Sequence, residues 1–278
     1  MYQINVNGRL LDLSSPKVMG IVNVTPDSFF SPSRAMAEAD LRRRVSGMIA
    51  DGAAILDIGA YSTRPGADVV STEEEMARLR WALQIINSET PDAILSIDTF
   101  RSEVAQRCVE EYGAAIINDI SAGDLDSRMY DTVARLCVPY IIMHMKGTPA
   151  TMQASPEYDD VVREVMLYLA KKVSLLRDKG IADIIIDPGF GFGKTLDHNY
   201  QLLAHLSELR ELQCPLLVGV SRKSMVYRLL DSTPEDALNG TTVVNTIALL
   251  QGANILRVHD VHVAVEAVHI CDKMNYNR

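Results

Sequence analysis

The sequence predicts a (β/α)8 TIM barrel of the α/β class, in which eight parallel strands alternate with helices, preceded by a short N-terminal β-hairpin. Eight short apolar runs recur along the 278 residues, and each is continuous rather than alternating in hydrophobicity, as strands buried on both faces are. Segments with helical periodicity separate these runs. Eight strand–helix units in about 250 residues match such a barrel, whereas a doubly wound sheet would need a glycine fingerprint that is missing.

Residues 2–13 are expected to form the hairpin, with Asn7–Gly8 as its turn, because Asn-Gly is a preferred dipeptide of two-residue turns. In a barrel this hairpin would cover the bottom. The barrel strands follow, and no linker or low-complexity tract interrupts them, so we expect residues 1–278 to form one domain. The predicted strands cover residues 17–24, 53–60, 93–100, 114–120, 139–145, 182–189, 215–221 and 253–260.

The helices are predicted from their periodicity and their ends. Helix 71–89 begins with Ser71 or Thr72 as N-cap, and glutamates follow three residues later. Several helices end in a glycine just before the next strand, which is typical of helix C-termini. The clearest helical segments are 36–52, 71–89, 102–113 and 158–180, and the glycines are Gly52, Gly113, Gly180 and Gly252.

Composition and charge exclude several classes of protein. The net charge of -9 and the pI of about 5.2 argue against a sequence-independent nucleic-acid binder, which needs a basic face, but allow a small anionic substrate in a local basic pocket. We expect no membrane span, because no apolar run is long enough, and no signal peptide. The widely spaced cysteines are expected to be buried reduced thiols of a cytoplasmic protein. They are Cys108, Cys137, Cys214 and Cys271.

Polar side chains terminate every predicted barrel strand. In a barrel these ends meet at one rim, where active sites are built, and polar groups so close to a packed core need partners or a ligand. Along the chain the strand ends carry Asn23, Asp57, Asp98, Asn118 with Asp119, His144, Asp187, Ser221 with Lys223, and Arg257 with His259.

These polar residues divide into three kinds. Asp98, Asn118 and Asp187 can bind the polar edge of a heterocycle, whereas Arg64, Lys223 and Arg257 can hold anions. Asn23 is a neutral oxygen ligand of the kind that Mg²⁺ accepts. The first and last strands adjoin when a barrel closes, so an anion site is expected at that seam, beside an acidic pocket in the barrel mouth. The seam residues are Asn23, Arg257 and His259.

Three loop segments are expected at the rim, two that resemble lids and one that is rich in glycine. Segments 25–35 and 61–71 are long, rich in Ser, Pro and Gly, and typical of lids; Arg64 in the second can close over an anion. The stretch DPGFGFGKT, residues 187–195, looks like a phosphate loop but has Pro188 where the Walker pattern needs glycine. Its glycines instead allow a sharp turn at the rim, and Lys194 is the member least expected to take part in chemistry.

Eight motifs together make the chain resemble the dihydropteroate synthase family of folate biosynthesis. They occur in order and span about residues 17–270, which is far more specific than any one glycine loop. The matching stretches are MGIVNVTPDSFF (19–30), DIGAYSTRPGA (57–67), IDTFR (97–101), IINDI (116–120), MHMKGTPATMQ (143–153), DPGFGFGK (187–194), VGVSRKSM (218–225) and RVHDV (257–261).

The resemblance implies a transferase that joins p-aminobenzoate to 6-hydroxymethyl-7,8-dihydropterin diphosphate, giving 7,8-dihydropteroate and diphosphate. It implies Mg²⁺ as cofactor and a homodimer. By resemblance, Asp98, Asn118, Asp187 and Lys223 bind the pterin, and Asn23 (with the Mg²⁺), Arg257 and His259 hold the diphosphate. The aminobenzoate lies near Phe192, Ser221, Arg64 and Pro65, and Thr63 and Gly219 complete the substrate-binding set. Asp98, Lys223, Arg257 and His259 are the implied catalytic residues.

The sequence departs from the family pattern in both rim loops. Ala60 and Tyr61 replace a common Gly-Glu pair, and SFFSPSR replaces a common Ser-Asp-Gly-Gly segment after the first strand. Three other functions remain as alternatives. A pterin-binding methyltransferase with a corrinoid partner would not need STRPG or SRKS. A Schiff-base aldolase would use Lys223. A non-catalytic pterin-binding paralogue would not need the seam residues.

Overall fold

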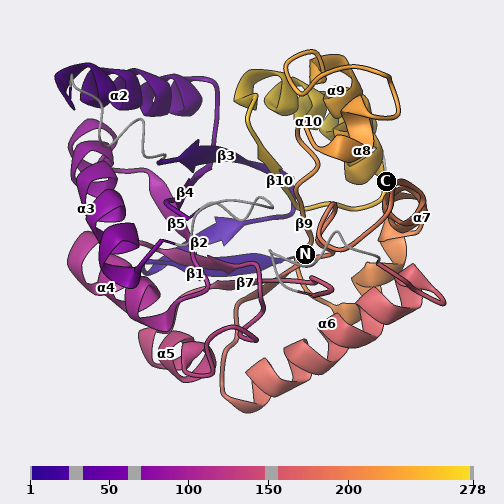
Figure 1. Cartoon of the computed structure of the whole chain (residues 1–278), viewed down its shortest axis with the longest axis horizontal. Coiled ribbons are helices and arrows are strands. Elements are labelled where there is room, and N and C mark those ends of the chain that lie inside the picture. Colours follow the sequence, from indigo (N-terminus) through magenta and orange to yellow (C-terminus); the bar gives the residue numbers. More distant parts are fainter. Residues whose placement is uncertain (1, 25–33, 62–69, 148–155, 276–278) are drawn as a thin grey trace.

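The computed structural model describes residues 2–24, 34–61, 70–147 and 156–275. Eight strands surround a central axis and helices form an outer ring (Figure 1). The strands are β1 Gln3–Val6, β2 Arg9–Asp12, β3 Lys17–Asn23, β4 Ile55–Gly59, β5 Ile94–Asp98, β6 Ile116–Asp119, β7 Tyr140–Met143, β8 Ile184–Asp187, β9 Leu217–Val218 and β10 Ile255–Val258. The helices are α2 Arg34–Ala50, α3 Thr72–Glu89, α4 Ser102–Tyr112, α5 Met129–Leu136, α6 Val161–Asp178, α7 Leu196–Ala204, η1 Leu206–Leu212, α8 Ser224–Tyr227, α9 Leu238–Leu250 and α10 Val261–Asn275.

The parallel sheet closes into the predicted barrel. Its strand order is β8-β7-β6-β5-β4-β3-β10-β9, so the first and last barrel strands, β3 and β10, are neighbours. A parallel bridge between Ile186 and Leu216 joins the two ends, and the Ile186 amide donates to the Pro215 carbonyl at 2.9 Å. Strand β9 is shorter than the predicted 215–221 at both ends, and at its start Pro215 has no N–H to donate to a ladder.

The predicted hairpin forms and closes the bottom of the barrel. Asn7 and Gly8 both have positive φ, 52° and 80°, as a turn that matches the strand twist requires. Figure 1 shows strands β1 and β2 lying across the end of the barrel. The hairpin buries Ile4, Val6 and Leu13 against residues inside the barrel, so its apolar face is a plug.

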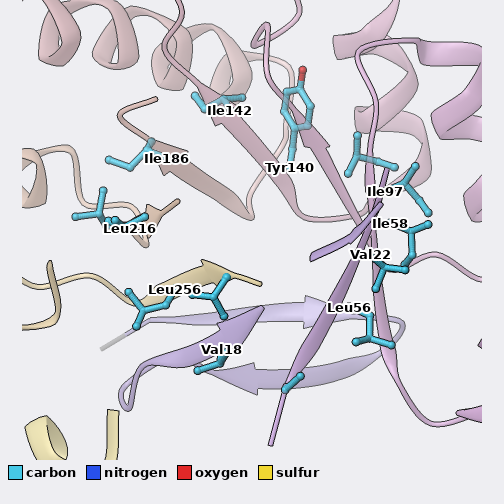
Figure 2. Packing of buried hydrophobic residues seen from close by; sticks show 14 of the residues in the cluster. Val18, Val22, Leu56, Ile58, Ile97, Tyr140, Ile142, Ile186, Leu216 and Leu256 are labelled. Atoms are coloured by element: carbon cyan, nitrogen blue, oxygen red, sulfur yellow. The ribbon is translucent and has the colours of Figure 1, made fainter. Parts of the chain in front are cut away.

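The main apolar core lies between the barrel wall and the helices. Alternate strand residues such as Val22, Leu56 and Ile142 are fully buried and pack against the helix residues Leu79 and Leu169. Figure 2 shows these strand side chains around the ring of strands. Because the other residues of each strand point into the barrel, the strands are apolar on both faces, which explains their continuous apolar runs.

The helix ends agree with the sequence in most details. Ser71 is the N-cap of α3, and its side chain accepts from the Glu74 amide. The four predicted glycines all have positive φ, between 72° and 101°, just after their helices. Helix α6 begins at Val161, later than the predicted residue 158, because Asp160 caps it.

One prediction about the cysteines is wrong. Cys108, Cys214 and Cys271 are buried, but Cys137 is exposed. It follows α5 with a φ of 54°, and this left-handed backbone turns its side chain away from the apolar face. The prediction came from the apolar neighbours of Cys137 in sequence, which do not report the backbone reversal. No described helix is long and apolar enough to cross a membrane.

Candidate active site

The inward-facing strand residues change from apolar to polar along the barrel axis. At the hairpin end they form a closed apolar layer that includes Met19, Ile55 and Ile116. Side chains alternate along a strand, so the residue two positions further on also faces inward. At those positions lie the polar residues Asp57, Ser96, Asn118, Asp187 and Arg257, together with Gly219 and the apolar residues Ile21 and Met143. The barrel mouth, or pocket, therefore has an apolar floor and walls that are mostly polar.

The first group of polar side chains is centred on Asp57. This carboxylate is fully buried, and its Oδ2 accepts from Arg257 Nε at 2.6 Å and from Asn118 Nδ2 at 3.0 Å. Arg257 Nη2 also donates to Asp98 Oδ2 at 2.7 Å. Residues from strands β4, β5, β6 and β10 thus form one hydrogen-bonded network, which includes three of the predicted site residues.

Burial sets the charges in this network. Burial raises the pKa of Asp98 to about 7, although the nearby Arg257 guanidinium opposes the change. Burial alone would lower the pKa of Arg257, but the carboxylates of Asp57 and Asp98 raise it above its ordinary value. Arg257 therefore stays charged, while Asp98 can change its protonation state near neutral pH.

A second group surrounds Asp187 at the end of β8. Asp187 Oδ1 accepts from the Gly189 amide at 2.7 Å, and Asp187 is 6% exposed. Lys223 Nζ donates to the Phe190 carbonyl at 2.6 Å and lies 4.7 Å from the centre of the Phe192 ring. Burial raises the pKa of the Asp187 carboxyl, although the charge of Lys223 opposes this change. Burial also lowers the pKa of Lys223 to about 8, although the charge of Asp187 opposes it.

Gly219 connects the two groups. A Cβ on Gly219 would lie 3.8 Å from Arg257 Cβ and 4.0 Å from Lys223 Nζ. The predicted substrate-binding glycine therefore lies on the pocket wall between two cations, where any side chain would project into the pocket.

The loop after β8 is held together by Lys194. Lys194 is 4% exposed, and its ammonium donates to the carbonyls of Gly189 at 2.8 Å and Phe192 at 3.2 Å and lies 3.0 Å from His144 Nδ1. Burial lowers the pKa of Lys194 to about 7. Its ammonium points into the loop and fixes the backbone that carries Phe192, so it does not project from the loop as a phosphate-binding lysine would.

Gly189 is the position in this loop where a side chain is least tolerated. Its φ is +70°, and a Cβ would lie 1.9 Å from the His144 carbonyl oxygen. Gly113→Ala is the matched control, because Gly113 has a φ of +72° and nothing within 4 Å of its Cβ position. We expect Gly113→Ala to cost about 1–2 kcal/mol for the left-handed backbone alone, and Gly189→Ala to cost more than about 3 kcal/mol, because it adds the clash. Equal losses in urea denaturation would contradict the close approach.

The seam of β3 and β10 carries the remaining predicted anion ligands. His259 follows β10, and its backbone amide donates to Ser221 Oγ at 3.2 Å. Burial, with the neighbouring cations Arg257 and Arg44, lowers the pKa of His259 to about 4. Asn23 ends β3 and is exposed. Asn23, Arg257 and His259 thus come from the two strands that meet at the seam, and Arg257 and Arg44 are cations close enough to His259 to affect its pKa.

Two residues that contribute to the site were not identified from the sequence as having a site role. Asp57 was predicted only as one of the polar residues at the strand ends; it lies in the middle of β4, and nothing in that apolar run indicates that it joins Asn118 to Arg257. Arg44 lies on α2, where its Nη2 donates to the Ile21 carbonyl at 2.9 Å. Its place in the basic triplet Arg42–Arg44 was the only signal.

Some predicted residues do not join the pocket or cannot be placed. Asp119 and His144 face outward: Asp119 accepts from Tyr140 Oη at 2.6 Å, and His144 contacts Lys194. Thr63, Arg64 and Pro65 lie outside the described residues, as does most of the predicted loop 25–35. Within the described ranges, no cluster of three or more His, Cys, Asp or Glu side chains could hold a metal ion.

His144 gives a testable pH dependence of stability. Burial, together with the Lys194 ammonium, lowers the pKa of His144 to about 3. Between about pH 3 and pH 6.5 the unfolded chain binds a proton that the folded chain does not, so this contribution to stability is lost as pH falls from 6.5. We expect the stability of the wild type relative to His144→Gln to fall by about 2 kcal/mol between pH 7.5 and pH 5.

Urea denaturation of both proteins at the two pH values measures this difference. Groups that do not contact His144, including Asp98, contribute equally and cancel, whereas Lys194 contacts His144 and has a pKa of about 7, so the measured difference belongs to the His144–Lys194 pair. A difference that does not change with pH would mean that His144 is protonated normally in the folded state.

Comparison with known proteins adds four findings. A family model described as "Pterin binding enzyme" matches residues 19–259. Dihydropteroate synthase of Escherichia coli is 44% identical over 267 residues, which are 95% of this chain and 94% of that protein. A solved dihydropteroate synthase of Yersinia pestis, complexed with a sulfonamide drug, has a TM-score of 0.90 at 41% identity and covers 99% of both chains. The Xanthomonas albilineans enzyme with 4-aminobenzoic acid has a TM-score of 0.89 at 40% identity, covering 99% of this chain and 98% of that one.

Proposed function

The chain belongs to the pterin-binding enzyme family, and from this premise we propose how its barrel pocket carries out the reaction of the dihydropteroate synthases. The activity is the transfer of a dihydropterin-methyl group from 6-hydroxymethyl-7,8-dihydropterin diphosphate to p-aminobenzoate. One observation supports the assignment of roles most strongly: two separate hydrogen-bond groups, one of Arg257 with Asp57 and Asp98 and one at the buried Asp187, line the same barrel mouth.

The pterin is proposed to lie deepest, between Asn118, Asp187 and Lys223. Asp187 is buried, and its carboxylate can accept two N–H bonds from the aminopyrimidine edge of the ring. Asn118 supplies an amide, and Lys223 a donor for ring acceptors. Asp98 lies at the rim side of this space. If the pocket bound an apolar ring instead of a pterin, the polar groups of Asn118, Asp187 and Lys223 would have no hydrogen-bond partners on the ligand.

The diphosphate is proposed to lie at the seam, against Arg257 and His259. Mg²⁺ fits this place as a metal that arrives with the diphosphate, because exposed Asn23 offers one neutral oxygen and Mg²⁺ commonly takes its other ligands from phosphates and water. When bound, it supplies positive charge for the departing diphosphate. Arg257 and His259 donate hydrogen bonds to the same oxygens.

The aminobenzoate is proposed to lie nearer the rim, against the Phe192 ring and Ser221. Arg64 and Pro65, with Thr63, are proposed to complete this part of the site from the segment after β4. The Phe192 ring is held by the loop that Lys194 fixes, and it offers a flat apolar wall to the benzene ring.

The reaction breaks the bond between the pterin methylene carbon and the diphosphate oxygen. The bonding electrons leave with diphosphate, where Arg257 stabilises the growing charge. The positive charge left on the methylene carbon is delocalised into the pterin ring, and the neutral aryl amine then attacks that carbon and gives its proton to solvent. No strong base is needed, because an aryl amine is unprotonated at pH 7.

Asp98 is proposed to stabilise the positive charge that develops on the pterin. Its carboxyl lies 2.7 Å from Arg257 Nη2, so it is within reach of both substrate ends. We expect Asp98→Asn to lower kcat by about 10²-fold, since the amide keeps the hydrogen-bonding shape but loses the charge. Single-turnover rates measure the chemical step, and a near-normal rate would remove this role.

A single assay tests the proposed function. Diphosphate release from the pterin diphosphate is followed with and without p-aminobenzoate, in the presence of Mg²⁺. Release that depends on p-aminobenzoate is expected. Release that does not depend on it, or none at all, would overturn the proposal; a chelator arm tests the Mg²⁺ requirement separately.

We also infer a homodimer and a cytoplasmic location. Helices α9 and α10 expose a set of large apolar side chains that a second copy can cover: Val243, Ile247, Leu250, Ile270 and Met274. Light scattering of the wild type and of Ile247→Asp tests this pairing. The four free cysteines suit a reducing compartment, and cell fractionation tests the location.

A further inference from the structure

Asp57 is a buried carboxylate that the proposed reaction does not use directly. We propose that Asp57 is a positioning residue, which orients Asn118 for the pterin and Arg257 for the diphosphate at the same time. The inference rests on the proposed function, because it assigns those two ligands to the two ends of one substrate.

The position of Asp57 in the barrel makes this double contact possible. In the strand order, β4 is separated from β6 by β5 and from β10 by β3. Asp57 faces inward from the middle of β4 and is fully buried. One oxygen atom, Oδ2, accepts from Asn118 Nδ2 at 3.0 Å and from Arg257 Nε at 2.6 Å. It therefore joins residues on opposite sides of its own strand.

The contact fixes which atom of Asn118 faces the substrate. A carboxylate oxygen can only accept, so Asn118 presents its NH₂ group to Asp57. The Asn118 carbonyl oxygen and the second N–H of its NH₂ group are then left for the pterin, and the contact with Asp57 fixes on which side each of them lies. Without Asp57 the Asn118 amide can rotate and present the wrong atom to the pterin. Asp57 therefore sets the orientation of Asn118 without contacting the pterin itself.

The contact also fixes the plane of the Arg257 guanidinium. Nε is held by Asp57 and Nη2 by Asp98, at 2.6 Å and 2.7 Å. Neither carboxylate takes Nη1, which leaves that edge for phosphate oxygens. Because the diphosphate can displace the partly exposed Asp98 but not the buried Asp57, Asp57 remains the anchor of Arg257 when substrate is bound.

A merely structural role for Asp57 predicts a different result. Removing a buried ion-pair partner lowers stability whatever the substrate does. A positioning role additionally predicts weaker binding of two separate ligand fragments, one at each end of the pocket. Inorganic diphosphate reports the Arg257 end, and 6-hydroxymethylpterin, which has no diphosphate, reports the Asn118 end.

The test uses Asp57→Asn in the full chain, with calorimetric titration of both fragments. We expect each dissociation constant to rise by about 10- to 100-fold, the loss typical when the partner that orients a ligand-binding group is removed. The KM for p-aminobenzoate should not change, since Asp57 does not contact Phe192 or Ser221. Asp126→Asn is the matched control, because that carboxylate accepts two bonds from Ser102 away from the pocket.

A double-mutant cycle tests whether Asp57 acts through Asn118. If it does, Asp57→Asn adds no further loss of pterin affinity in an Asn118→Ala background, whereas independent roles give additive losses and overturn that link. Asp57→Glu is the second variant should Asp57→Asn not fold, because it keeps the charge but displaces the oxygens, and both fragments should again bind more weakly.

The outcomes separate the two levels of inference. Wild-type protein without p-aminobenzoate-dependent diphosphate release would overturn the proposed function. Active wild-type protein whose Asp57 variants bind both fragments normally would overturn the positioning role alone. Weaker binding of only one fragment would overturn the double role.

Discussion

Replacing Arg257 with methionine is expected to lower kcat/KM for the pterin diphosphate by roughly 1,000-fold. The substitution removes the guanidinium that meets the departing charge, and it leaves Asp57 and Asp98 without the cation that lies 2.6 Å and 2.7 Å from them. Affinity for inorganic diphosphate should fall with it. Steady-state kinetics and calorimetry measure both quantities.

The free energy of unfolding of Arg257→Met should fall by about the cost of one buried ion pair, although Arg257 pairs with two carboxylates. Breaking a buried ion pair costs about 3–5 kcal/mol, and the fully buried Asp57 bears this cost. Burial already raises the pKa of Asp98 to about 7, so this second carboxyl can take a proton instead of staying charged. Arg42→Met is the matched control, because Arg42 also bridges two carboxylates, Glu38 and Glu89, outside the pocket. Unchanged diphosphate affinity in Arg257→Met would contradict the anion site at the seam.

Replacing Asp187 with asparagine is expected to weaken binding of the pterin rather than of the diphosphate. Its oxygen can still accept from the Gly189 amide, so the loop should keep its shape. The amide cannot accept two N–H bonds with full charge, and two charge-assisted bonds are worth about 3–6 kcal/mol, so we expect kcat/KM to fall on the order of 1,000-fold.

The two variants control for each other. Asp187→Asn should lose affinity for 6-hydroxymethylpterin and keep affinity for inorganic diphosphate, while Arg257→Met should do the reverse. Equal losses of both ligands in either variant would mean that the two ends of the pocket are not separate sites.

Most of the architecture could be predicted because it depends on local patterns. Continuous apolar runs, helical spacing and glycine helix ends are set by neighbours in sequence, and they placed the strands within a few residues. In a closed βαβ repeat the first and last strands are neighbours. The sequence therefore predicted that Asn23, Arg257 and His259 come from adjacent strands, although no contact between them was known.

The features that the sequence did not predict depend on strand register, on backbone partners and on local reversals of the chain. Asp57 and Arg257 are 200 residues apart, and only the stagger of the closed sheet brings their atoms together. The partners of Lys194 are mostly backbone carbonyls, which leave no trace in residue type. Cys137 is exposed because one residue reverses the chain direction. Periodicity contains none of these relations.

The hairpin that seals the barrel has a consequence for the order of assembly during synthesis. Residues 3–12 are made before every strand on which they dock. The plug packs against Ile185, Leu217 and Ile255 as well as against nearer strands, and its Asn5 amide donates to Asp183 Oδ2 at 2.9 Å. While translation proceeds, this segment must therefore wait, with Ile4 and Val6 uncovered, until β10 has emerged from the ribosome. A nascent chain halted before residue 255 would leave residues 3–12 without part of their docking surface, and the uncovered apolar side chains are of the kind that chaperones bind.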